Sequence, residues 1–170
     1  MTPDIDLRLS TMIRALDQVI MPALDPNNSL AREQAGLLAG HLRLLAAQWN
    51  RTENYARTCL DDLVQSLEGF EPAGGPHTAK AFDAVARTIA ARSPNGIEQQ
   101  YKQLSAVADA LVRAVDIDGD AALRQQLHRA LLAFSRRQAL RDRSWFALSG
   151  FDLKPDELIP IEKLAPERPL

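Results

Sequence analysis

The sequence predicts an all-α fold: an antiparallel helical bundle of about five helices, with one very long second helix and an extended C-terminal arm. Three observations lead to this prediction. Apolar residues recur every three or four positions through most of the chain. Alanine, leucine, arginine and glutamine, which favour helices, are abundant. Proline and glycine gather in a few short segments that separate the helical stretches, and no alternating pattern typical of strands appears.

The first predicted helix begins near Ile5, because apolar residues from there step by three or four positions and form one face. These residues are Ile5, Leu9, Met12, Ile13, Leu16, Val19, Ile20 and Leu24. Asp4 and Asp6 stand at its start, where a carboxylate suits the helix dipole. Pro22 should kink or end the helix, and Pro26 ends it.

The second predicted helix runs from Leu30 to Leu67, with Ser29 as N-cap and Gly69 closing it. At 1.5 Å per residue it would be about 57 Å long, so it must kink, protrude or find a partner. A heptad-like seam follows it, comprising Leu38, Leu42, Leu45, Trp49, Thr52, Ala56, Cys59, Leu63 and Ser66. The polar stretch from Gln48 to Tyr55 predicts either an exposed turn of helix or a bend.

Three further helices are predicted, over Thr78–Arg92, Ile97–Val115 and Ala121–Asp142. The segment Glu71–Pro76 is rich in glycine and proline and predicts a flexible loop. Asn95, three residues before Glu98, resembles a capping box.

The chain is predicted to form one helical bundle domain over residues 1–150, followed by an arm over residues 151–170. Four prolines interrupt the arm and exclude a long helix. Six apolar residues make it unlike a disordered tail, namely Phe151, Leu153, Leu158, Ile159, Ile161 and Leu164. We therefore expect the arm to pack on its own bundle or on a partner.

Composition excludes several classes of protein. With 20 basic and 22 acidic side chains the net charge is −2, which argues against a nucleic-acid-binding domain. His41 and Arg43 interrupt the most apolar stretch, Leu37–Trp49, so it does not predict a membrane span. The chain has one cysteine, Cys59, and its first residues lack the pattern of a secretory signal, so we expect a cytoplasmic protein.

The sequence predicts no metal and no cofactor. The run Asp116–Asp120 begins like an EF-hand loop, but the sixth position is Ala121 and the twelfth is Leu127 instead of a carboxylate. A turn in which Asp118 or Asp120 caps the next helix explains the run better. No glutamate precedes a histidine by three residues, as a di-iron bundle requires.

No motif for a nucleophile, a nucleotide or a phosphate loop appears, and Cys59 on the apolar seam is interpreted as a core residue. Five residues are the candidates for lining a pocket between helices: Glu33, His41, Trp49, Tyr101 and His128. Arg124 to Arg143 carries six arginines and one aspartate, which indicates either an anion-binding patch or a solvated face paired with acidic residues.

These observations favour a non-enzymatic helical protein that acts through assembly, as a homodimer, with another protein as a further option for the partner. The length and apolar surplus of the second helix are the main reasons. The alternative is a small-molecule-binding protein or enzyme with its pocket between helices.

Overall fold

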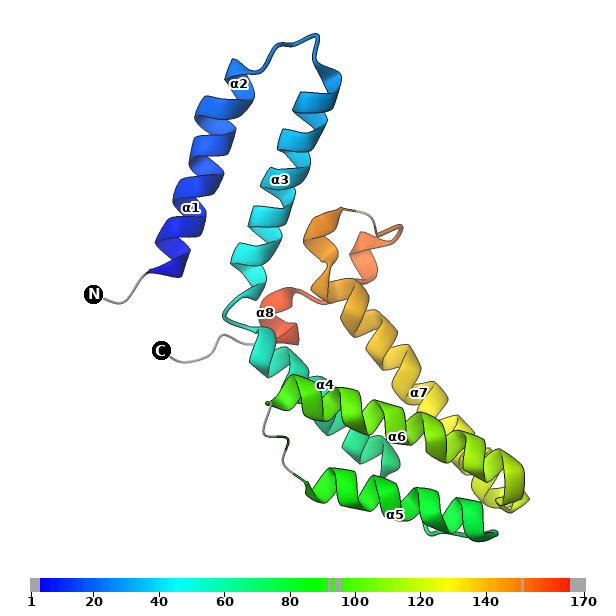
Figure 1. The fold of residues 1–170 in the computed structure, drawn as a ribbon. Coiled ribbons are helices and arrows are strands. Elements are labelled where there is room, and N and C mark those ends of the chain that lie inside the picture. The colour runs from blue at the N-terminus through cyan, green and yellow to red at the C-terminus, as the bar shows by residue number, and fades with distance from the viewer. Residues whose placement is uncertain (1–3, 92, 94–95, 151, 166–170) are drawn as a thin grey trace. The chain divides into compact units, whose positions relative to one another are not determined.

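The computed structural model describes residues 4–91, 93, 96–150 and 152–165, and within these residues the protein is all-helical without a strand (Figure 1). The described residues form two compact units. The first comprises residues 4–52 and 142–165, and the second comprises residues 53–141. The predicted division into a 1–150 domain and a 151–170 arm stays a prediction.

The first unit begins with helix α1 (Ile5–Ala15), which continues through the π-helical turn η1 (Leu16–Ile20) into the short α2 (Met21–Ala23). Asp4 caps α1, because its Oδ1 accepts a hydrogen bond of 2.9 Å from the Leu7 amide. The wider π turn precedes Pro22, which has no amide hydrogen to donate. The predicted first helix is thus present, with a widened turn before the proline.

Helix α3 (Ser29–Gln48) runs back alongside α1, so that the two form a helical hairpin (Figure 1). The predicted N-cap, Ser29, is wrong. Asn28 is the N-cap, and its Oδ1 accepts a hydrogen bond of 3.0 Å from the Ala31 amide. The buried apolar residues of this hairpin are Leu9 in α1, Leu16 in η1 and Ala39 in α3.

The single long second helix is also wrong, because the chain leaves α3 at Gln48 and starts α4 (Thr52–Leu67) after a turn. The Gln48 carbonyl accepts hydrogen bonds from the Arg51 amide at 2.9 Å and from Thr52 Oγ1 at 3.1 Å, which ends α3. Arg51 is buried, and its guanidinium donates to the Ala165 carbonyl at 3.0 Å. The polar stretch in the sequence therefore marks a break in the helix, at which Gln48, Arg51 and Thr52 form hydrogen bonds.

The C-terminal arm packs within the first unit, although it is less extended than predicted. It contains the short helices η3 (Pro155–Glu157) and α8 (Ile161–Leu164), and η2 (Ala147–Ser149) precedes it. Leu164 and Ala165 are buried, and the Ile159 amide donates to the buried Ser144 Oγ at 2.9 Å. Leu153 is fully exposed, and Phe151 lies outside the described residues.

The second unit packs α4, α5 (Pro76–Ala90), α6 (Ile97–Asp118) and most of α7 (Ala121–Trp145) around one apolar core. The core residues are Leu60, Leu63, Leu67, Val85, Leu104, Ala108, Leu111, Val115, Leu123 and Leu127. The predicted third, fourth and fifth helices match α5, α6 and α7 to within a few residues. The predicted cap Asn95 lies outside the described residues, and Gly96 is the N-cap of α6.

Asp118 ties the start of α5 to the end of α6. Its carboxylate accepts hydrogen bonds from the amides of His77, at 2.8 Å, and Thr78, at 2.9 Å, and from Thr78 Oγ1, at 2.7 Å. Burial raises the pKa of Asp118, but these hydrogen bonds outweigh burial and hold the pKa below its usual value. Asp120 caps α7 through its Oδ1, which accepts from the Leu123 amide. The two aspartates of the calcium-like run therefore cap two different helices.

Gly74 and Gly75 allow this connection to form. The Gly75 amide donates to the Asp118 carbonyl at 2.8 Å, and the Asp120 amide donates to the Ala73 carbonyl at 2.9 Å. A Cβ on Gly74 would lie 2.5 Å from the Asp118 carbonyl oxygen, and the φ of Gly74 is +151°. A side chain at this position is excluded both by space and by backbone conformation.

Glycine-to-alanine substitutions should have opposite effects in α3 and in this loop. A Cβ on Gly36 or on Gly40 would meet no atom within 4 Å, and both residues are helical. Gly36→Ala and Gly40→Ala should each raise the free energy of unfolding by about 1 kcal/mol, because alanine favours the helix. Gly74→Ala should lower it by more than that amount. Urea unfolding measures all three, and a stabilised Gly74→Ala variant would contradict the described loop.

Removing the Asp118 carboxylate should destabilise the second unit. In Asp118→Ala the amides of His77 and Thr78 lose their acceptor, and the buried Thr78 hydroxyl loses its closest partner. The melting temperature should fall by several degrees. Asp83→Ala, at an exposed position of α5, is the matched control and should melt close to the unsubstituted protein. Equal melting of the two variants would show that the cap contributes little.

Candidate functional site on the α1–α3 hairpin

The hairpin exposes most of its large apolar side chains. Of the exposed large apolar residues among those described, the second unit contributes only Ile117 and Leu132. The hairpin alone contributes Ile5, Leu7, Met12, Val19, Ile20, Leu30, Leu37, Leu38 and Leu45. Single exposed leucines are ordinary on a protein surface, but a set of this size on two neighbouring helices indicates an interaction surface.

On the first helical segment of the hairpin, α1 with η1, the exposed apolar residues form a stripe beside a stripe of buried residues. Ile5, Met12 and Val19 follow one another at intervals of seven residues, as do the buried Leu9 and Leu16. Residues spaced by seven fall on nearly the same side of a helix. The buried stripe faces α3, so the exposed stripe lies at one edge of the hairpin interface.

On α3 the exposed leucines form a second stripe. Leu30 and Leu37 are seven residues apart, Leu38 and Leu45 are seven apart, and Gln34 and His41 lie on the strip between these two pairs. No lysine, arginine, aspartate or glutamate falls within the stripe. We call the exposed stripe of α3, together with Ile5, Met12 and Val19, the hairpin face.

The five pocket candidates are divided between the two units. Glu33 and His41 are exposed on α3, and Trp49 is half-buried at its end, where Nε1 donates to Asp6 Oδ1 at 2.8 Å. Tyr101 is half-buried against the core of the second unit. His128 is exposed on α7, with Nε2 3.3 Å from Asp116 Oδ1. Within each unit these contacts are local, and a pocket shared by the five residues stays a prediction.

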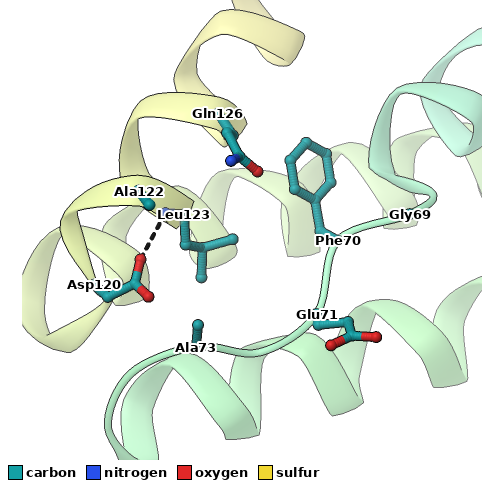
Figure 2. A pocket seen from close by; sticks show the side chains of 8 residues that line it. All are labelled: Gly69, Phe70, Glu71, Ala73, Asp120, Ala122, Leu123 and Gln126. Carbon is teal, nitrogen blue, oxygen red and sulfur yellow. Dashed lines mark hydrogen bonds between the residues drawn. The ribbon is translucent and has the colours of Figure 1, made fainter.

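The second unit has a shallow hollow of about 330 Å³ between the α4–α5 loop and the start of α7 (Figure 2). Its lining residues are Gly69, Phe70, Glu71, Ala73, Asp120, Ala122, Leu123 and Gln126. Figure 2 shows the Asp120 carboxylate engaged with the Leu123 amide, and Glu71 is the other carboxylate of the lining. Convergent titratable groups, which mark an active site, do not line this hollow.

The arginines of α7 are largely paired with nearby acceptors. Arg137 and Arg141 both bind the carboxylate of Asp62, which is mostly buried between them. Burial raises the pKa of Asp62, but hydrogen bonds from the two guanidinium groups outweigh it and the pKa lies below its usual value. The interpretation of this run as a face paired with acidic residues therefore accounts for these two arginines.

Two further arginines of α7 also have partners in the structure. Arg143 holds Asp152 through two hydrogen bonds of 2.8 and 2.9 Å, and this pairing lowers the pKa of Asp152 to about 2. Arg124 donates to the Gly119 carbonyl at 3.2 Å, and its Nε lies 3.6 Å from Asp116 Oδ1. The paired arginines contribute little free charge for binding an anion.

Among the described residues no group of three or more histidine, cysteine, aspartate or glutamate side chains is arranged to hold a metal ion. Likewise, none of the described helices combines the length and apolarity that crossing a membrane requires. Cys59 is buried on α4, and Gln138 Nε2 lies 3.3 Å from its Sγ.

Comparisons with protein-family models, with curated proteins and with solved structures gave no match to this chain. The hairpin face was missed as a site in the sequence, because Leu38 and Leu45 were assigned to the seam of one continuous helix. The seven-residue spacing of Leu30 and Leu37 was the signal that could have identified it.

The ion pair of Arg143 with Asp152 should give a pH-dependent contribution to the stability of the first unit. The pKa of Asp152 is about 2 in the folded chain, below the value of about 3.9 of a free aspartate. The contribution is therefore present above about pH 4 and is lost as the pH falls towards 2. Asp152→Asn should lower the melting temperature at pH 6 and have a smaller effect at pH 3. Asp156→Asn, an exposed position in the same segment, is the control and should show no such pH dependence.

Proposed function

We propose that this chain is a non-enzymatic helical assembly protein that acts as a homodimer, joined through the hairpin face. The observation that carries the proposal is the exposure of leucines along α3, on the side of the helix that α1 leaves open. A pair of helices buries one stripe of each and leaves the rest in water. Covering the hairpin face with a second apolar surface would remove that unfavourable exposure.

The size of the hairpin face is compatible with a stable interface. Helix α3 has 20 residues and is therefore about 30 Å long. Two packed helices span about 20 Å across, which gives a projected face of roughly 600 Å². A standard interface buries about 800 Å² of accessible surface per partner, and accessible area exceeds the projected area of an uneven surface. The whole face is needed, so a partner should cover both helices.

A cytoplasmic setting belongs to the same proposal. The single cysteine of the chain is buried, and a reducing compartment suits a fold that needs no disulfide.

A charge placed in the hairpin face should dissociate the dimer. Light scattering at micromolar concentration should give a mass near twice 18.8 kDa for the unsubstituted chain. Leu38→Glu should give a mass near 18.8 kDa, with the dissociation constant raised at least tenfold, because a carboxylate loses its hydration in an apolar interface.

The matched control is Leu132→Glu, since Leu132 on α7 is 54% exposed and Leu38 is 53% exposed. This variant should remain dimeric, and circular dichroism should show the same helix content for both variants. A monomeric unsubstituted chain, or equal dissociation by both substitutions, would contradict the proposal.

A further inference from the structure

Two polar residues interrupt the apolar stripe of α3, and they restrict how a second copy can cover it. Gln34 and His41 are exposed and lie between the leucine pairs of the stripe. In an interface, each would be buried, and a buried polar side chain is costly without a hydrogen-bond partner. The arrangement of the dimer must therefore provide a partner for both residues.

We infer that two copies of α3 pack antiparallel, around a two-fold axis that passes beside Leu37 and Leu38, and that Gln34 of each copy hydrogen-bonds to the partner's His41. This inference rests on the proposed function, since it names the geometry of the proposed dimer.

The symmetry of the stripe itself supports this register. Gln34 lies three residues before Leu37, and His41 lies three residues after Leu38. In an antiparallel two-fold pair, residues equally distant from the axis on opposite sides face each other. An axis midway between Leu37 and Leu38 therefore places each of these leucines only about 1.5 Å along the helix from its own copy, and each Gln34 level with the partner's His41.

Hydrogen-bonding chemistry favours the Gln34–His41 pair. The glutamine amide both donates and accepts hydrogen bonds, and so does a neutral imidazole. Gln34 and His41 can therefore form a hydrogen bond whichever tautomer the histidine adopts. The exposed stripe of α3 also lacks charged residues, so the antiparallel arrangement brings no like charges together within the stripe.

Two other arrangements pair these polar groups differently. A parallel pair sets Gln34 beside its own copy and His41 beside its own copy. Gln34 of one copy is then seven positions along the helix from the partner's His41. A face-to-face arrangement with α3 on the partner's first helix sets Gln34 level with the apolar Met21, because Trp49 of α3 lies level with Asp6 of α1. Only the antiparallel α3 pair gives each polar residue a different polar partner.

Disulfide trapping in a Cys59→Ser background tests the register, because a disulfide requires Cα atoms within about 7 Å. Leu37→Cys alone should form a covalent dimer under mild oxidation. Gln34→Cys alone and His41→Cys alone should not, since each lies about 10 Å along the helix from its own copy. A mixture of the last two, after subunit exchange, should form a covalent dimer. Glu33→Cys is the control on α3 outside the stripe and should stay uncrosslinked.

The outcomes separate the register from the dimer itself. Self-crosslinking of Gln34→Cys would indicate a parallel pair, and crosslinking of Leu38→Cys with Val19→Cys without a Leu37→Cys dimer would indicate α3 on the partner's first helix. Either result overturns the register while the dimeric mass in light scattering upholds the proposed function. A monomeric mass would overturn both. If Cys59→Ser does not fold, the series is run with Cys59 retained, since that thiol is buried.

Discussion

The second unit depends on one carboxylate. Asp118 accepts three hydrogen bonds from the first turn of α5 while it ends α6, so the start of α5 and the end of α6, 40 residues apart in sequence, share one fixed point. The close approach needs glycine at position 74, and the neighbouring backbone hydrogen bonds follow from it. With α5 and α6 fixed in this way, the apolar faces of α4 and α7 can meet theirs in a single core. The unit is thus complete in itself, with few large apolar groups left in water.

The first unit contrasts with this arrangement. Its polar groups are well used, as Arg51, Ser144 and Trp49 each make a hydrogen bond that joins separate segments. Many of its large apolar side chains stay exposed, because α1 and α3 bury one stripe of each helix against the other and η2 covers only part of α3. The difference between a unit that closes its own core and one that leaves its leucines exposed is the physical basis for proposing assembly. The arginines of α7 and the hollow near Phe70 offer no comparable reason for proposing a ligand.

Helix positions could be predicted from sequence where proline, glycine or a capping side chain marks an end. The all-helical class is confirmed, and α5, α6 and α7 were predicted closely. Whether the helix would break after Gln48 was left open by the sequence, because Arg51 at the break contacts Ala165, more than a hundred residues away. The same limit applies to Gly74, whose role depends on a close approach to Asp118 that local pattern does not reveal. The five pocket candidates were predicted from residue type, and residue type does not indicate which of the two compact units each residue belongs to.

The glycines of α3 have a consequence for how this helix behaves before it finds a partner. Gly36 and Gly40 weaken the helix and gain no packing within the chain. An isolated hairpin should therefore open locally at a low free-energy cost, and its amides should exchange with solvent faster than those of the second unit. In the proposed dimer, association holds α3 closed, so its exchange slows as protomer concentration rises. The glycines thus make the order of α3 sensitive to the concentration of the protein itself.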